Sequence, residues 1–110
     1  MSSRDERIAL NEVVFREVNE RIQDLAERFE LKDEPLDLVC ECGDADCVRR
    51  ISMTRAEYEE IRSDARQFAV HPGHEYPDVE EIIERRKGYD IVAKNRGAPE
   101  RIAEQTDPRG

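Results

Sequence analysis

All the cysteines and histidines of this chain fall in two short segments, and this clustering restricts the fold more than any other feature. The three cysteines lie in CECGDADC at positions 40–47, and the two histidines lie in HPGH at positions 71–74. Thiolates and imidazoles are the usual ligands of zinc in proteins. If both segments bind one metal ion, the chain must fold so that residues 40–47 and 71–74 come together.

The cysteine spacing suits a hairpin that bends between two strands. Side chains alternate along an extended chain, so Cys40 and Cys42 point to the same face, about 7 Å apart. A bend at Gly43 would let both sulfurs reach one ion, and the turn residues GDAD would return Cys47 as a third thiolate. The segment 36–53 is therefore predicted to be a cysteine hairpin.

Either histidine can supply the fourth ligand that a tetrahedral zinc ion needs. His71 ends a predicted strand whose alternation turns it away from the apolar face of Phe68 and Val70. His74 lies in a Pro-Gly loop, where the backbone can bring its ring close to the cysteines. We therefore predict a metal site whose ligands are Cys40, Cys42, Cys47 and His74. His71 is the alternative fourth ligand.

The donor set favours zinc, because thiolate-rich tetrahedral sites select that metal, and a [2Fe–2S] cluster with the same ligands is the alternative. A further alternative has no metal, only separate thiols and surface histidines. A catalytic metal is disfavoured, since HPGHE matches neither H-E-x-x-H nor H-x-x-E-H and the zinc deaminase pattern is absent. Glu41 and Glu75 lie nearby, but they are weak evidence among 27 acidic residues.

The composition indicates one small, polar domain. Of the 110 residues, 37% are hydrophobic and 41% are charged, so a metal staple would add useful stability to a modest core. The net charge of −9 lies almost wholly in residues 1–48, which hold 14 acidic against 6 basic residues. An acidic chain of this kind argues against binding to nucleic acid or to an anionic membrane.

The chain contains no apolar run near the ~20 residues that span a bilayer, and MSSRDERIALNE lacks an apolar signal core. We therefore expect a cytoplasmic protein. An odd number of cysteines in that compartment indicates metal ligands or reactive thiols rather than a disulfide framework.

Residues 4–29 are predicted to form one long helix with a heptad pattern. Ile8, Phe15, Ile22 and Phe29 recur every seven residues, and Asn11, Val18 and Leu25 occupy the intervening seam positions. We expect this seam to pack on the protein's own sheet, with Phe15, Ile22 and Leu25 buried. The alternative is a homodimer in which the helix forms a short coiled coil and Asn11 fixes the register.

The rest of the chain predicts an α+β fold, in which the long helix packs on a small, mainly antiparallel sheet of three to four strands. Thr54 and Glu57 form a capping box for a short helix, and a second short helix is expected between Pro77 and Gly88. Residues 1–95 would form the single domain, 71–77 its histidine loop and 96–110 a loosely docked polar tail. The expected strands are 36–42, 47–53, 66–70 and 89–95.

VCECGDADC, MTRAEYEEIR and PGHE resemble a family of small uncharacterised proteins from high-GC, mainly actinobacterial, genomes. The resemblance covers most of the chain, including FREVNERI and TDPR. It implies that the family's C-E-C-x4-C segment and P-G-H-E loop correspond to Cys40, Cys42, Cys47, Gly73, His74 and Glu75. The first Cys-x-Cys is also similar to that of CDGSH iron–sulfur proteins, but their Cys-Asp-Gly-x-His run is missing. The resemblance implies no activity.

Three functions are compatible with these features. The first is a small cytoplasmic protein-interaction module stabilised by zinc, whose partner is another protein. The second is a thiol-based redox or metal sensor that uses the Cys3His site. The third, a minor metal-dependent enzyme, is least favoured, because the sequence offers no catalytic motif.

Overall fold

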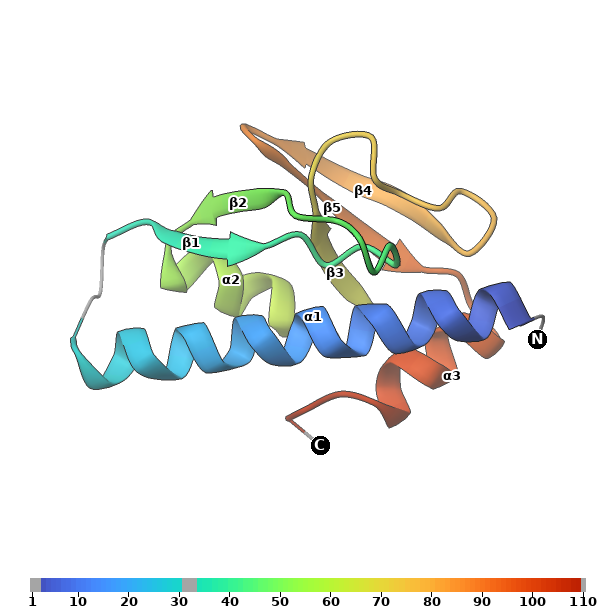
Figure 1. Cartoon of the computed structure of the whole chain (residues 1–110), viewed down its shortest axis with the longest axis horizontal. Helices are drawn as coiled ribbons and strands as arrows, with labels where there is room; N and C mark the ends of the chain where they lie inside the picture. Colours follow the sequence, from blue (N-terminus) through green and yellow to red (C-terminus); the bar gives the residue numbers. More distant parts are fainter. Residues whose placement is uncertain (1–2, 31–33, 110) are drawn as a thin grey trace.

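The computed structural model describes residues 3–30 and 34–109, and it has the predicted α+β architecture (Figure 1). In chain order its elements are α1 (Ser3–Arg28), β1 (Leu36–Val39), β2 (Arg50–Met53), α2 (Arg55–Arg62), β3 (Gln67–Val70), β4 (Glu80–Arg86), β5 (Tyr89–Lys94) and α3 (Ala98–Gln105). The long helix predicted over 4–29 is confirmed. In the two described stretches, no helix is both long and apolar enough to cross a membrane.

The strands form two antiparallel sheets rather than the one sheet predicted. β1 pairs with β2, with Leu38 opposite Ile51, and the second sheet has the order β3–β5–β4. The two sheets are linked where the N–H of Glu41 donates to the carbonyl of Ala69 over 2.8 Å. This link brings the cysteine segment after β1 next to β3, and the histidine loop follows β3 directly.

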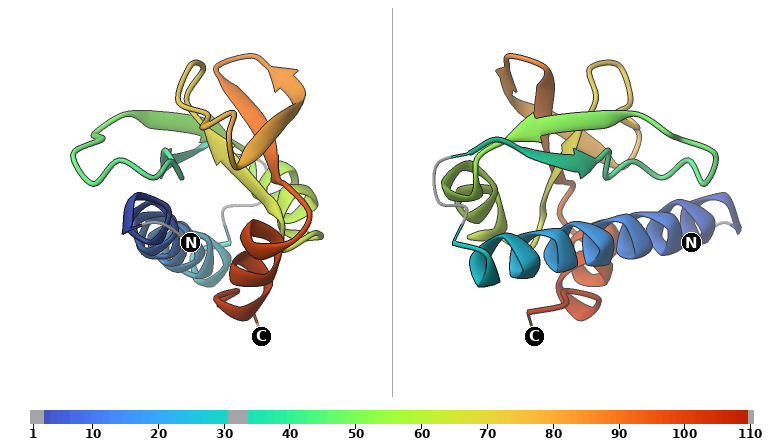
Figure 2. Two further views of the ribbon diagram at one scale, coloured as in Figure 1. Left: turned by 90° about the vertical axis from the view of Figure 1, so that its right-hand side faces the viewer. Right: turned by 60° about the vertical axis from the view of Figure 1, so that its left-hand side comes forward.

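α1 runs the length of the molecule below the β1–β2 hairpin, and α3 lies beside it (Figures 1 and 2). One apolar cluster joins the first sheet to α2, and it includes Leu38, Ile51 and Tyr58. A second cluster, around Phe68 and Val92 of the second sheet, also contains Cys40 and Cys42. The predicted metal site therefore begins at the edge of the core.

Local signals place α2 correctly. The Thr54 hydroxyl accepts from the N–H of Glu57 over 3.2 Å, and the Glu57 carboxylate accepts from the N–H of Thr54 over 2.9 Å. Both bonds satisfy backbone donors that the first helical turn leaves without partners. The predicted capping box is thus confirmed.

α1 turns a mainly polar face toward the rest of the protein. Between the buried side chains of Ile8 and Ala26, the buried residues are Glu12, Arg16, Asn19 and Gln23. The Arg16 guanidinium donates to the carbonyls of Ala65 and Ala103 over 2.8 and 2.9 Å, and it lies over the Phe68 ring. Such bonds are required, since a buried polar group without a partner is costly.

The predicted buried seam of α1 is wrong in part. Leu25 is 53% exposed, whereas Phe15 and Ile22 are half-buried, and Ile22 packs against the edge of the first cluster. A heptad pattern marks an apolar stripe on a helix but does not say what covers it. Here the polar stripe beside it makes the contacts within the chain.

The helix predicted between Pro77 and Gly88 is wrong, because this segment contains β4. Its strand pairing with β5 runs from Glu80 opposite Lys94 to Arg86 opposite Tyr89. Gly88, read as a helix stop, instead lies in the turn of the β4–β5 hairpin at φ +90°, a conformation that favours glycine. The distant pairing with β5 therefore overrides helix signals that are purely local.

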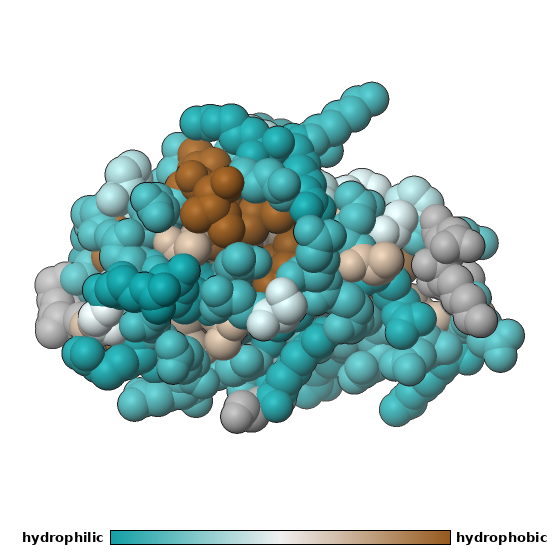
Figure 3. All heavy atoms as spheres, turned by 180° about the vertical axis from the view of Figure 1, so that it is seen from behind, coloured by the Kyte–Doolittle hydropathy of each residue, from teal (hydrophilic) through white to brown (hydrophobic). Residues whose placement is uncertain are grey.

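The second sheet carries an apolar patch on the face opposite the view of Figure 1, surrounded by hydrophilic side chains (Figure 3). On β4, Ile83 is 46% exposed at an irregularity in the pairing with β5. A surface hollow of about 280 Å³ between α2 and the sheet is lined by Ile61, Ile83 and Ile91 together with charged residues. Charged side chains of this kind discourage pairing at an edge strand.

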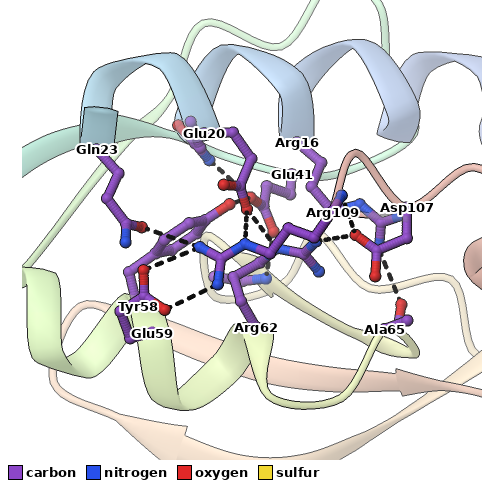
Figure 4. Close-up of polar contacts among 12 residues, drawn as sticks. Arg16, Glu20, Gln23, Glu41, Tyr58, Glu59, Arg62, Ala65, Asp107 and Arg109 are labelled. Carbon is purple, nitrogen blue, oxygen red and sulfur yellow. Dashed lines mark hydrogen bonds and ion pairs between the residues drawn. The ribbon is translucent and has the colours of Figure 1, made fainter. Parts of the chain in front are cut away.

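The tail from residue 96, predicted to be loosely docked, packs against the body of the protein. α3 buries Ala103, and the residues after it return to α1 and α2 (Figure 4). The Arg109 guanidinium donates to both carboxylate oxygens of Glu59 over 2.8 and 3.0 Å and to Glu20 over 2.9 Å. Asp107 accepts a further bond from the buried Arg62. The tail therefore belongs to the fold.

Candidate metal centre

The cysteine hairpin folds back through short-range hydrogen bonds. The N–H of Cys40 donates to the carbonyl of Arg49 over 3.1 Å, just beyond the last paired residues of β1 and β2. At the tip, the Asp44 side chain accepts from the N–H of Asp46 over 2.9 Å, and its carbonyl accepts from the N–H of Cys47 over 3.0 Å. The predicted GDAD turn thus returns the third cysteine toward the first.

Gly43 permits the hairpin to lie against α1. A Cβ atom at this position would stand 2.5 Å from the side chain of Ile8 and 3.0 Å from its Cα, which is too close for any other residue. The Gly43 carbonyl also accepts from the Asn11 amide over 2.7 Å. The glycine predicted as a bend therefore also fixes the hairpin on the first turns of α1.

The histidine loop contains a tight turn with a clear sequence origin. The N–H of His74 donates to the carbonyl of His71 over 3.0 Å, and Gly73 has φ +90°. Proline followed by a glycine at positive φ is the signature of a type II turn. Pro72 and Gly73 therefore reverse the chain after β3 and bring His74 back toward the cysteines.

The structure brings together the four predicted ligands. Their donor atoms all lie within 4.8 Å of one another. The Nδ1 atom of His74 is 3.6 Å from the Cys40 sulfur and 3.5 Å from the Cys47 sulfur. In a zinc tetrahedron with Zn–S near 2.3 Å and Zn–N near 2.05 Å, a sulfur and a nitrogen lie about 3.6 Å apart. The donor set and its spacing therefore fit one tetrahedral ion.

His71 lies beside this group without joining it. Its ring centre is 5.1 Å from that of His74, and its Nδ1 lies 3.1 Å from the carbonyl oxygen of Pro72. Its backbone N–H, however, donates to the Cys40 sulfur over 3.1 Å. Such a bond orients a thiolate and disperses its charge, so His71 supports the site through its backbone.

The three thiols differ in protonation. A hydrogen bond from the Cys40 thiol lowers the pKa of Cys42 to about 5, and the same bond, together with burial, raises the pKa of Cys40. Burial raises the pKa of Cys47. A metal ion would bind as the thiol protons leave.

Glu41 lies between two predicted ligands but points into the core, a role that sequence reasoning missed. Its fully buried carboxylate accepts from the Tyr58 hydroxyl over 2.8 Å (Figure 4). It also accepts from the Asn19 amide over 2.8 Å and from the N–H of Ala69 over 3.0 Å. Burial raises its pKa. Alternation on either side of Cys40 and Cys42 is the signal that could have placed it there. Glu41 anchors the hairpin and cannot serve the metal as a base.

The centre can be reached from one side. A surface pocket of about 230 Å³ is lined by Cys42, Asp44, Gly73, His74, Glu75 and Tyr76. Cys47 is half-buried, and one carboxylate oxygen of Glu75 is buried without a hydrogen-bond partner in the described part of the chain. Small solutes can therefore approach the donor group through this pocket.

No protein-family model matches the chain, and no match is found among curated proteins or solved structures. The resemblance drawn from C-E-C-x4-C and P-G-H-E stays a prediction.

Proposed function

We propose that Cys40, Cys42, Cys47 and His74 bind one structural zinc ion, in a small interaction module of the cytoplasm. The observation that carries this proposal is the compact donor group, three sulfurs and one ring nitrogen within 4.8 Å of one another. Four protein ligands complete the tetrahedron of a structural zinc site and leave no open position for a reacting water. This favours an interaction protein over an enzyme. Three free thiols also suit the reducing cytoplasm.

The ion would add a direct link between two parts of the fold that hydrogen bonds from Glu41 to Ala69 and from His71 to Cys40 already bring together. Cys40, Cys42 and Cys47 extend from the β1–β2 sheet, whereas His74 belongs to the loop after β3. Zinc binding by small domains contributes on the order of 10 kcal/mol, which is folding free energy where the unfolded chain has no site. Loss of the metal should therefore loosen the hairpin and the histidine loop together.

Zinc fits the donor group better than a [2Fe–2S] cluster does. A two-iron cluster distributes its ligands over two metal atoms, so donors on different irons must lie well apart. Here all four donor atoms lie within 4.8 Å, a spread suited to a single ion. The absorbance of the purified protein separates the two, since an iron–sulfur cluster is coloured and zinc is not.

A thiol-based sensor is the second candidate, and the access pocket favours it. Cys42 and His74 line this pocket, and Cys47 is half-buried, so a peroxide could reach the donor group. Two thiolates would then lose two electrons to the peroxide and form a disulfide. The peroxide, with two protons from water, would become two water molecules, and the zinc ion would be released.

The test is metal analysis of protein purified without a metal-affinity step. We expect about one zinc per chain, a lower melting temperature after treatment with a strong chelator, and retention of zinc in mild peroxide. Loss of zinc in peroxide, reversed by a thiol reductant with added zinc, would establish the sensor instead. Metal-free protein that melts identically with and without chelator would overturn both candidates.

A further inference from the structure

The outer surface of α1 carries most of the exposed apolar side chains in the described part of the chain. Seven large apolar side chains are exposed in the described residues; four lie on one side of α1, and a fifth, Phe29, directly follows its last residue on the same side. These five form the outer stripe, are between 37% and 72% exposed, and comprise Leu10, Val14, Val18, Leu25 and Phe29. The half-buried Phe15 and Ile22 border the stripe on the side of the hairpin.

On α1 the apolar and polar faces are exchanged relative to an ordinary surface helix of a monomeric protein. A surface helix ordinarily buries its apolar stripe and exposes its polar face. α1 instead buries Glu12, Arg16 and Asn19 and leaves Val14 and Leu25 in solvent. The outer stripe presents on the order of 500 Å² of apolar surface, near the largest patch on an ordinary monomer and typical of interaction sites.

Charged side chains beside the stripe lack partners within the protein. Glu6, Glu17, Arg21 and Arg28 are all exposed, and none has an ion pair with any residue in 3–30 or 34–109. Glu17 and Arg21 lie four residues apart in the order that favours pairing along a helix, yet the structure contains no such pair. The four charges are therefore free to meet another molecule.

We propose that the partner of this surface is a second copy of the chain, with the two α1 helices antiparallel about a two-fold axis at Val18. Val18 lies at the middle of the segment from Arg7 to Phe29. In this arrangement a residue a given number of positions before Val18 in one copy faces the residue the same number of positions after Val18 in the second copy. Val14 therefore faces Ile22 of the second copy. Leu10 lies beside Leu25 of the second copy, and apolar side chains cover one another along the stripe.

The charges select this orientation. In antiparallel pairing Glu17 faces position 19 of the second copy and Glu6 faces position 30, so Arg21 and Arg28 of the second copy each lie two residues, about 3 Å along the helix, from the facing position. Long side chains span that offset, and the symmetry repeats each pair. In a parallel pairing these four residues, which all flank one side of the stripe, would lie on opposite sides of the interface in the two copies and could not pair with one another. A self-complementary surface of this kind is what a two-fold dimer requires.

The size of the stripe sets the strength expected of the dimer. Standard interfaces bury about 800 Å² per partner, and smaller ones belong to weak or transient complexes. The apolar stripe alone falls below that value, and the flanking charged side chains add to it. We therefore expect a reversible dimer that forms at micromolar concentrations. This inference does not depend on the metal site.

Sedimentation equilibrium of the full-length, metal-loaded protein between about 1 and 200 μM tests the proposal. Wild type should pass from monomer to dimer in this range. Leu25→Glu should remain monomeric, whereas Val48→Glu, a change at an exposed valine outside the stripe, should dimerise like wild type. Circular dichroism and metal content of each variant confirm that it is folded. A monomeric wild type, or a dimer that Leu25→Glu leaves intact, would overturn the proposal.

A charge-reversal experiment tests the orientation. Glu17→Arg and Arg21→Glu should each fail to form a homodimer, because each brings like charges together across the two-fold axis. An equimolar mixture of the two variants should dimerise, since both contacts again join opposite charges. Repulsion confined to one helix would persist in the mixture, so a mixture that stays monomeric would contradict antiparallel pairing.

Discussion

The imidazole Nδ1 of His74 lies 3.5 Å from the sulfur of Cys47, although 27 residues separate the two in the chain. Two local turns produce this contact, one at the tip of the cysteine hairpin and one at Pro72 and Gly73. Each turn is closed by a backbone hydrogen bond of its own, from Cys47 to Asp44 and from His74 to His71. Together they direct the two segments toward one shared position.

The two histidines offer a matched pair of variants. His74→Ala removes a proposed ligand and should abolish stoichiometric zinc binding and lower the melting temperature. His71→Ala should retain zinc, because that ring lies outside the donor group and its backbone N–H still reaches Cys40. Zinc per chain and thermal melting measure both effects. Loss of zinc from His71→Ala alone would exchange the roles of the two residues.

The buried hydroxyl of Tyr58 should contribute to stability through Glu41. Tyr58→Phe removes one of three donors to a fully buried carboxylate and should cost about 1–2 kcal/mol of unfolding free energy. Tyr89→Phe is the control, since its hydroxyl bonds to Glu57 and Arg86 in a partly exposed position, and it should cost less than about 1 kcal/mol. Urea denaturation measures both. Equal costs for the two variants would show that the Glu41 contact is not important.

The free energy of unfolding should depend on pH through the titration of the buried Glu12 carboxyl. Burial raises its pKa from 4.5 to about 8, and Lys94, which donates to both Glu12 and Glu80, opposes this shift. At a pH between about 4.5 and about 8, Glu12 therefore keeps its proton in the folded protein but has released it in the unfolded chain. This contribution to stability therefore falls as pH rises from about 4.5 to about 8.

Glu12→Gln isolates that contribution. The variant keeps an oxygen acceptor for Lys94 but cannot ionise, so its unfolding free energy relative to wild type should increase with pH across the same window. Urea denaturation of both proteins at several pH values, with equal zinc, gives the difference. A difference that does not change with pH would show that Glu12 does not titrate in this way.

The site was predictable from the sequence because its determinants are local and few. The chain has only three cysteines and two histidines, and GDAD and HPGH carry the turn residues that fold each segment. The structure then places Cys40, Cys42, Cys47 and His74 in one group. Choosing His74 over His71 needed only the Pro-Gly turn between them.

The environment of α1 and β4 could not be predicted in the same way. Arg16 can be buried because it bonds to the carbonyl of Ala103, which is 87 residues further along the chain. Glu12 can be buried because it bonds to Lys94, which is 82 residues further along. Periodicity along the helix carries no information about such partners. The segment from Pro77 to Gly88 carries helix signals for the same reason: its proline, its acids and its glycine suit either a helix or a strand, and only the pairing with β5 decides for β4.

Zinc-edge X-ray absorption of the purified protein tests the metal centre most directly. The account predicts one zinc ion per chain with three sulfur neighbours at about 2.3 Å and one nitrogen neighbour at about 2.0–2.1 Å. Protein without zinc, or zinc surrounded only by oxygen and nitrogen, would contradict it.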